Sequence, residues 1–295
     1  MDGFIRSGLI RSETAKMLSD AGIYQPFIEA DRIICHLLRE DRASLHAHPE
    51  RLISPREAEF VMNLAARRAR GEPLAYIIGF SLFLDREFMV ESTLIPRPET
   101  EILTSLADEY IKKTSGSGIL ADWCTGSGCI AVTLAARNPR WSVYAADSNQ
   151  AALLTASANC RFHSVRERVT LIECESPAEA LQIVGEASLD LVVSNPPYIP
   201  TAVIDTLERQ VRDYEPRVAL DGGIDGLDVC RLMLVELPRL MKDGAAFFIE
   251  TGGAGQVSEL ANLSGQAGRG LDFIRSFEDH RGIDRFMLWI KSKKE

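Results

Sequence analysis

Residues 189–200, LDLVVSNPPYIP, form a pattern that can bind a polar group at the end of a strand. The apolar run predicts a buried strand, and Asn195, Pro196, Pro197 and Tyr198 follow it directly. Two prolines fix the backbone angle φ and remove two N–H donors, so carbonyl oxygens are left without an internal partner. We therefore predict a rigid pair of acceptors, the Asn195 side-chain oxygen and the Pro196 carbonyl, beside the aromatic wall of Tyr198. The alternative is a rigid turn that only ends the strand.

This acceptor pair suits a planar –NH2 group, because each of its two hydrogens can point at one oxygen. Amide and exocyclic amine nitrogens are poor nucleophiles since their lone pair is delocalised, so orientation must supply much of the rate. Well-oriented reactants gain up to roughly 7–11 kcal/mol, and the acceptors bind more strongly as the nitrogen becomes positive. Asn195, Pro196 and Tyr198 are therefore our candidate catalytic residues, and no histidine or lysine base is required.

A glycine-containing segment, ILADWCTGSGCIAVTLA at residues 119–135, predicts a strand, a turn and a helix. Gly126 and Gly128 let the backbone approach a ligand, and the helix N-terminus offers N–H groups to an anion. Asp147 closes the next predicted strand about 20 residues later, where a carboxylate can accept bonds from ribose hydroxyls. This pattern fits a nicotinamide or flavin dinucleotide about as well as S-adenosylmethionine.

Asp122, at the end of the first of these strands, favours S-adenosylmethionine. Its carboxylate can meet the amino group of a methionine moiety, whereas it would repel a pyrophosphate; the alternative is that it only accepts bonds from the loop amides. The third strand ends at IECESP, residues 172–177, which places Glu175 or Ser176 beside an adenine ring. An acid in an exposed loop is the other interpretation of Glu175.

The chain divides by pattern into three parts. Residues 1–70 show helical spacing throughout, with Ser54 and Glu57 as a capping box, and predict a small helical domain. Residues 71–97 change to short apolar runs and predict a β-hairpin linker. Residues 98–295 alternate strands and helices, which is typical of a doubly wound, mostly parallel sheet, and end in two strands too close together for a helix between them. We predict an antiparallel terminal pair there.

Composition excludes several classes of function. The 295 residues carry a net charge of -9, so bulk attraction to nucleic acid is not expected. The first 71 residues hold 11 basic and 10 acidic side chains, which leaves the negative charge in the remainder. The six cysteines form no CxxC pair, and no cluster has metal-ligand spacing. We found neither a secretion signal nor an apolar run long enough for a membrane span, so we expect a cytoplasmic protein.

The Asn-Pro-Pro-Tyr segment resembles the signature of amino-methyltransferases, which use S-adenosylmethionine to methylate adenine, cytosine or glutamine nitrogen. Five segments from residue 70 to the end of the chain together resemble the PrmC/HemK family, while residues 1–70 match it in placement and size only. The segments are YIIGFSLFLDREFMVESTLIPRPETE (76–101), DWCTGSGCIAV (122–132), VSNPPYIP (193–200), RDYEPRVALDGGIDGLD (212–228) and FFIETGGAGQ (247–256).

The resemblance implies a Rossmann-like α/β methyltransferase fold and an activity. Family members methylate the side-chain nitrogen (N5) of the glutamine in the Gly-Gly-Gln motif of peptide-chain release factors, releasing S-adenosylhomocysteine. It implies that Asn195 and the Pro196 carbonyl hold the glutamine amide, with Pro197 and Tyr198 in the pocket wall. It implies cofactor contacts from Asp122, Cys124, Thr125, Gly126, Ser127, Gly128, Asp147, Glu175, Ser176 and Asn195. The segment LIPRPETE, with Arg97 and Glu101, would border the substrate glutamine; the alternative is a proline-led helix start.

Two features bear on the substrate. Where the family usually has Asp-Leu-Gly-Thr-Gly, this chain has Trp123 and Cys124, a version also seen in the sister family that methylates a ribosomal-protein glutamine. That sister family resembles PRSP where this chain has PRPETE, so residues 96–101 favour a release factor. An adenine methyltransferase acting on nucleic acid and a binding module without chemistry are the remaining alternatives. We expect a monomer that binds release factors, without a metal and without direct contact to nucleic acid or membrane.

Overall fold

The computed structural model describes residues 4–114, 116–264 and 270–293. The chain forms two compact units. The first takes in residues 1–80 together with the short segment 208–214, and the second takes in residues 81–207 and 215–295. Nowhere in the described ranges is a helix both long and apolar enough to cross a membrane.

The first unit is a helical bundle. Its helices are α1 (Ser7–Asp20), α2 (Pro26–Leu38), α3 (Arg42–Ala47), α4 (Pro55–Ala69), α5 (Leu74–Ile78) and α11 (Arg209–Arg212), and a small antiparallel sheet joins β1 (Ile5–Arg6) to β2 (Leu52–Ile53). Leu18, Ile33, Ile34 and Val61 are fully buried in one apolar cluster. Helices α1, α2 and α4 therefore pack around a core of their own.

Local signals set the ends of two of these helices. The predicted capping box of α4 is present: the Glu57 N–H donates to the Ser54 hydroxyl over 3.2 Å, and the Ser54 N–H donates to the Glu57 carboxylate over 2.7 Å. Residues 74–78 form helix α5, although their short apolar run was predicted to belong to the hairpin. Pro73 precedes this helix and Gly79 ends it with a φ of +81°. Proline and glycine thus mark the start and the end of a single helical turn whose apolar residues resemble a strand.

The second unit is built on a seven-stranded sheet in the order β10-β11-β9-β8-β5-β6-β7. Strands β5 to β9 run parallel, and β11 runs antiparallel to both β9 and β10. The sheet strands are β5 (Gly118–Trp123), β6 (Trp141–Asp147), β7 (Val169–Glu173), β8 (Leu189–Ser194), β9 (Met241–Glu250), β10 (Leu271–Glu278) and β11 (Asp284–Lys291). This topology confirms the predicted α/β fold class and the antiparallel pair at the C-terminal end.

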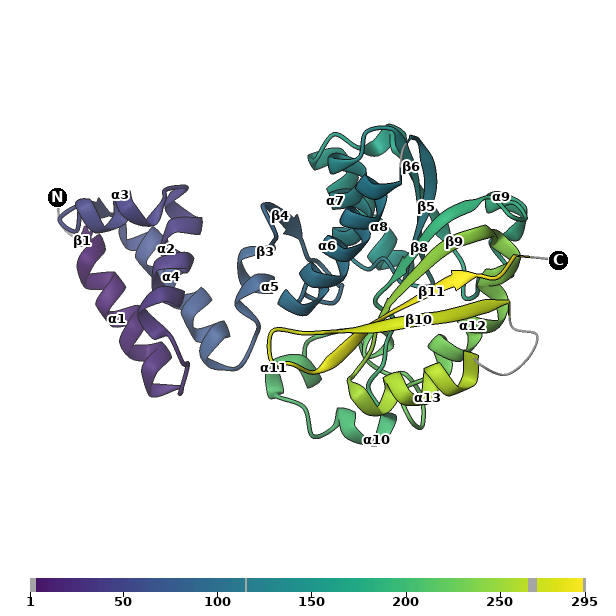
Figure 1. Ribbon diagram of the computed structural model, residues 1–295. Coiled ribbons are helices and arrows are strands. Elements are labelled where there is room, and N and C mark those ends of the chain that lie inside the picture. The colour runs from purple at the N-terminus through teal and green to yellow at the C-terminus, as the bar shows by residue number, and fades with distance from the viewer. Residues whose placement is uncertain (1–3, 115, 265–269, 294–295) are drawn as a thin grey trace. The chain divides into compact units, whose positions relative to one another are not determined.

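Helices cover both faces of this sheet (Figure 1). One face carries α6 (Pro98–Lys113), α7 (Cys129–Arg137) and α8 (Gln150–Phe162), and the other carries α12 (Asp228–Leu240) and α13 (Ala254–Ser264). Neighbouring strand residues belong to opposite clusters, as Leu120 and Ala121 of β5 do, because side chains alternate along a strand. The unit also contains the short helices α9 (Leu181–Val184) and α10 (Thr201–Ile204) and the 3-10 turns Arg166–Arg168 and Arg217–Ala219.

The sheet register brings two predicted segments together. Trp123 of β5 pairs with Ser194 of β8, and Ser194 pairs with Ile249 of β9. The residues that follow, Cys124 and Asn195, therefore leave the sheet side by side at the carboxyl ends of parallel strands. This is also where the strand order reverses, which is the usual ligand position in open α/β sheets.

A buried asparagine fastens strand β4 (Arg86–Met89), which forms a hairpin with β3 (Phe80–Phe83), within the second unit. The Asn159 side chain on α8 accepts from the Met89 N–H over 2.9 Å and donates to the Met89 carbonyl over 2.9 Å. The same amide donates to the Ser127 carbonyl over 2.8 Å. One side chain thus ties the strand before residues 90–97 to the glycine-containing loop.

The segment after β8 packs against a glycine-rich loop. The Ile199 N–H donates to the Leu220 carbonyl, and the Gly222 N–H donates back to the Ile199 carbonyl. Gly226 has a φ of +79°, and a Cβ there would lie 2.2 Å from the Tyr198 carbonyl oxygen. Only glycine allows this approach of two backbones, so Gly226 fixes the position of the Asn-Pro-Pro-Tyr segment.

We expect Gly226→Ala to lower the melting temperature more than Gly244→Ala. Gly244 has a similar φ of +83° with open space around it, so alanine there carries only the strain of a left-handed backbone, about 1 kcal/mol. At Gly226 the same strain is joined by the overlap with the Tyr198 carbonyl. Thermal unfolding of the two purified variants measures the difference, and equal melting temperatures would contradict the close approach.

Candidate active site

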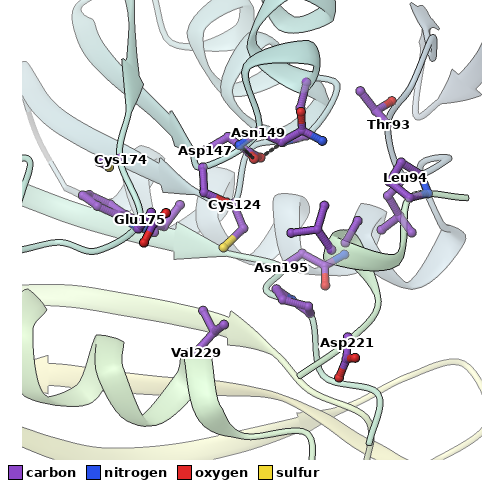
Figure 2. A pocket seen from close by; sticks show the side chains of 18 of the residues that line it. Thr93, Leu94, Cys124, Asp147, Asn149, Cys174, Glu175, Asn195, Asp221 and Val229 are labelled. Atoms are coloured by element: carbon purple, nitrogen blue, oxygen red, sulfur yellow. Dashed lines mark hydrogen bonds between the residues drawn. The ribbon is translucent and has the colours of Figure 1, made fainter. Parts of the chain in front are cut away.

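A cavity lies at the carboxyl ends of β5, β6, β7 and β8 (Figure 2). Its wall comes from the loops that follow these strands, from residues 92–94, from residues 216–221 and from α12. Six residues predicted from the sequence line it: Cys124, Gly126, Asp147, Glu175, Asn195 and Pro197. Residues that are far apart in the sequence are thus brought to one cavity.

The other predicted residues lie outside the lining of the cavity. They are Arg97, Glu101, Asp122, Thr125, Ser127, Gly128, Ser176, Pro196 and Tyr198. Asp122, Thr125 and Ser127 are buried, and Gly128, with a φ of +79°, brings its backbone close to Ala156 of α8. These residues shape the loop from within.

Asp122 is fully buried at the N-terminus of α7. One of its carboxyl oxygens, Oδ2, accepts from the Thr125 hydroxyl over 2.6 Å and from the Ala131 N–H over 3.0 Å. The other oxygen, Oδ1, has no hydrogen-bond partner among the described residues. Burial raises the pKa of Asp122 from 3.8 to about 7, and these two bonds oppose that rise. The protein's own carboxyl group thus occupies the helix end that could otherwise bind an external anion.

Asp147 holds the loop after β5 in place. Its carboxylate accepts from the Gly126 N–H over 2.8 Å and from the Asn149 N–H over 2.9 Å. Burial raises the pKa of Asp147, and the backbone N–H groups oppose that rise. Each oxygen keeps a lone pair for another donor, so this carboxylate can also accept from neighbouring hydroxyl groups of a ligand.

Cys124 lies beside this carboxylate in a left-handed conformation with a φ of +62°. Burial raises the pKa of its thiol well above 9.0. The side chain is therefore a neutral wall of the cavity rather than a thiolate nucleophile.

The Asn195 side chain is linked to a buried carboxylate through one buried hydroxyl. Its Nδ2 donates to the Thr100 hydroxyl over 2.9 Å, and that hydroxyl donates to Glu250 Oε2 over 2.8 Å. The Tyr198 hydroxyl donates to Glu250 Oε1 over 3.0 Å. Within the described part of the chain, Asn195 Oδ1 and the Pro196 carbonyl receive no hydrogen bond. Two acceptors are therefore left without a donor: Asn195 lines the cavity, and the buried Pro196 follows it directly in the chain.

Glu250 and Tyr198 titrate far from their ordinary ranges. Burial raises the pKa of Glu250 from 4.5 to about 7, while the Thr100 and Tyr198 hydroxyls lower it. Burial, followed by the negative charge of Glu250, raises the pKa of Tyr198, so its hydroxyl stays protonated and donates.

Arg97 and Glu101 each have a partner elsewhere in the second unit. Arg97 pairs with the buried carboxylate of Glu215 over 2.6 Å, and Glu215 also accepts from the Ile95 N–H. The Glu101 carboxylate accepts from the Leu84 N–H over 2.8 Å, at the turn of the β3–β4 hairpin. The segment PRPETE thus bonds to the β3–β4 hairpin through Glu101 and to Glu215 through Arg97. A contact from Arg97 or Glu101 to a substrate stays a prediction.

Several residues of the site were missed from the sequence. Thr100 and Glu250 look like an ordinary helix start and strand end, and only the folded chain connects them. Residues 92–94 complete the wall, where Ser92 adopts a φ of +55°. Val229, Leu232 and Met233 line the cavity from α12, where their helical spacing reads as core. The family-like segments at 76–101 and 212–228 contained part of this wall without indicating which residues face the ligand.

Comparison with known proteins identifies the family. The model of the PrmC N-terminal domain matches residues 10–79, and that of the methyltransferase small domain matches residues 100–212. A release factor glutamine methyltransferase from Nitratidesulfovibrio vulgaris is 38% identical over 282 residues, which cover 95% of this chain and 93% of its own length. One from Caulobacter vibrioides is 35% identical over 292 residues, 97% of this chain and 98% of its own. This chain belongs to the release factor glutamine methyltransferase family.

A solved structure supports the fold of this family member. The catalytic domain of hMettl16, in complex with a MAT2A 3′UTR hairpin, aligns with a TM-score of 0.50 and 14% sequence identity. The alignment covers 83% of this chain and 86% of that one. This likeness supports the α/β fold described above.

The cavity of this family member fits S-adenosylmethionine better than a dinucleotide. A pyrophosphate needs free N–H donors at the N-terminus of α7, but Asp122 already uses the Ala131 N–H there. The Gly126 N–H is likewise bound by Asp147. A methionine amino group, in contrast, is a cation that carboxyl oxygens can bind. The described residues also contain no group of three or more histidine, cysteine or acidic side chains able to hold a metal ion.

We expect the stability of the cofactor-free protein to report the titration of Asp122. Because the folded-state pKa lies above that of the unfolded chain, folding favours the protonated group, and this contribution is lost as the pH rises from about 4 to about 7. The free energy of unfolding should fall in this window by up to about 1.4 kcal/mol per pH unit relative to Asp122→Asn.

Chemical denaturation of both proteins at pH 5 and pH 8 tests this expectation. Glu250 titrates in the same range in both, so it cancels from the comparison. A difference in stability that is the same at the two pH values would contradict the titration of Asp122.

Proposed function

We propose that this protein transfers a methyl group from S-adenosylmethionine to the side-chain amide nitrogen (N5) of the glutamine in the Gly-Gly-Gln motif of peptide-chain release factors. The observation that carries the proposal is the pair of unpartnered acceptors, Asn195 Oδ1 and the Pro196 carbonyl, beside the cavity. The curated relatives at 34–38% identity, named release factor glutamine methyltransferases, support the same substrate.

The proposed cofactor site uses the loops after β5, β6 and β7. Asp147 would accept from the ribose hydroxyls, the backbone of residues 124–128 would face the methionine moiety, and Glu175 and Ser176 would border the adenine. Asp122 would attract the methionine amino group from below the loop, where its Oδ1 has no other partner. When bound, S-adenosylmethionine supplies a methyl group on a positively charged sulfur and leaves as S-adenosylhomocysteine.

The acceptors act on the substrate amide by orienting it. Asn195 Oδ1 and the Pro196 carbonyl each accept one N–H of the glutamine, which fixes the plane of the amide and the direction in which its nitrogen can attack. As the nitrogen forms its bond to the methyl carbon it becomes positive, and both hydrogen bonds strengthen. The rings of Pro197 and Tyr198 would limit the movement of the amide. The enzyme therefore stabilises the transition state more than the ground state.

The methylated nitrogen must finally lose one proton. A protonated amide is a strong acid, so water can take the proton without a dedicated base. This agrees with the cavity lining, which in the part of the chain that the structure describes includes neither histidine nor lysine. The acidic side chains of the lining serve binding in this mechanism.

We further propose that the enzyme acts as a monomer in the cytoplasm, on the release factor rather than on nucleic acid. The net charge of -9 argues against general attraction to a phosphate backbone. In this proposal residues 1–70 form a substrate-recognition domain, residues 71–97 the linker and residues 98–295 the methyltransferase domain. A glutamine pocket cannot tell one protein loop from another, so the helical domain must contribute specificity.

Asn195→Ala should abolish methyl transfer and keep most of the affinity for S-adenosylmethionine, because it removes one of the two acceptors and leaves the loop after β5 intact. Mass spectrometry of a whole release factor after incubation with enzyme and S-adenosylmethionine measures the added methyl group, and calorimetry measures cofactor binding. A variant that methylates the factor at the wild-type rate would show that Asn195 does not orient the amide.

The double variant Tyr24→Ala/Phe27→Ala should raise the KM for the whole factor by about tenfold or more. Both rings are exposed on the bundle, Tyr24 by 92% and Phe27 by 52%, and exposed aromatic side chains are frequent anchors of protein interfaces. A short peptide carrying Gly-Gly-Gln serves as the control, since it should be methylated equally by both enzymes. If the KM for the whole factor is unchanged, this face of the bundle does not contact it.

A further inference from the structure

Thr100 lies between the candidate catalytic amide and a buried carboxylate. It is 2% exposed, Glu250 is fully buried, and the two belong to α6 and β9. Each of the two contacts of the Thr100 hydroxyl is of ordinary hydrogen-bond length, 2.8 Å to Glu250 and 2.9 Å to Asn195. Asn195 itself is only partly buried, so packing alone does not decide which way its amide faces.

The direction of these bonds follows from the number of hydrogens available. A hydroxyl has one hydrogen, and an ionised carboxylate can only accept. The Thr100 hydrogen must therefore point at Glu250, and its oxygen can then only accept from Asn195. The Asn195 atom next to Thr100 must be the nitrogen Nδ2, which leaves Oδ1 on the opposite side of the amide. In the reverse orientation two oxygens would face each other without a hydrogen between them.

We propose that Glu250 is a positioning residue, which acts through the Thr100 hydroxyl to keep the oxygen of Asn195, and not its NH2, turned toward the substrate amide. This inference rests on the proposed function. A flipped Asn195 would present two N–H donors to the two N–H donors of the glutamine, and the substrate could not be held. Tyr198 donates to the second oxygen of Glu250, so it satisfies the carboxylate without competing for Thr100.

The ionised state of Glu250 sets the direction of the two hydrogen bonds that run from Asn195 through Thr100 to Glu250. The groups that face this carboxylate are Glu99 on α6, Arg285 on β11, Tyr198 after β8 and the neutral Cys129 thiol on α7. Burial raises the pKa of Glu250 to about 7, and Glu99 adds to this while Arg285 opposes it. Once protonated, Glu250 can donate to Thr100, whose hydrogen is then free to turn toward Asn195. The rate of the chemical step should therefore rise with pH through about 7.

The first test replaces the hydroxyls on α6 one at a time. Thr100→Val removes the hydroxyl that links Asn195 to Glu250 and keeps the shape of the side chain. We expect kcat on a whole release factor to fall by about 10- to 100-fold, with little change in KM or in S-adenosylmethionine affinity. Thr100→Ser restores the hydroxyl and should recover most of the rate. Thr104→Val is the matched control, because Thr104 is equally buried one turn later and donates only to the Thr100 carbonyl. A wild-type kcat for Thr100→Val would overturn the proposal.

The second test uses Glu250→Gln, which offers one acceptor oxygen where the carboxylate offers two. We expect a lowered kcat that no longer rises between pH 6 and pH 8, whereas the wild-type kcat at saturating substrates rises across that range. Asp122, which also titrates near 7, is present in both proteins, so any pH dependence that it adds is common to both kcat profiles. A Glu250→Gln enzyme that keeps the wild-type rise would overturn the positioning role.

A third measurement separates this inference from the proposed function. If the wild-type enzyme transfers no methyl group to the factor, the proposed function fails, and the Asn195 side chain is then followed directly. Its NH2 signal in nitrogen-15 spectra is identified by its loss in Asn195→Asp, and its exchange with water should be slower in the wild type than in Thr100→Val. Equal exchange in the two proteins would show that Thr100 does not hold this amide.

Discussion

Asp122 and Glu250 lie at the ends of β5 and β9, on either side of β8, with their carboxyl groups fully buried. A buried carboxylate is unfavourable unless it receives hydrogen bonds, so each must recruit donors from neighbouring elements. Asp122 receives them from the loop and the first turn of α7, while Glu250 receives them from α6 and from the segment after β8. The need to satisfy two carboxylates thus ties α6, the first turn of α7 and the segment after β8 to the sheet beside the cavity.

Backbone geometry supplies the second part of this arrangement. The prolines after Asn195 leave the Pro196 carbonyl without a donor, and the glycine-rich loop at 220–226 holds the same segment from the other side. Gln256 on α13 joins the two, because its Nε2 donates to the carbonyls of Tyr198 and Asp225. Rigid acceptors therefore result from residues that restrict the backbone and from a side chain that bridges two loops.

The sequence predicted the fold and part of the site, because those features are encoded locally. Strand and helix periods, glycine turns and the segment Asn195–Tyr198 can each be recognised within a few residues. The hydrogen bonds that join Asn195, Thr100 and Glu250 cannot be recognised in this way, since Thr100 and Glu250 are 150 residues apart and meet only through the order of the strands. Helix α5 was not predicted for a different reason. It is a single turn, and its helical spacing is too short to outweigh a composition typical of strands.

The position of Asp122 has a consequence for competition inside a cell. ATP and the dinucleotides carry the same adenosine as S-adenosylmethionine, so recognition of the adenosine alone would admit them. They differ in bearing phosphates on the ribose, which in the proposed site would point toward the loop after β5. There two backbone donors, the N–H groups of Gly126 and Ala131, are already bound by carboxyl groups of the protein. In the proposed site these two bonds leave the loop fewer donors for a phosphate, which disfavours nucleotides without a separate steric gate.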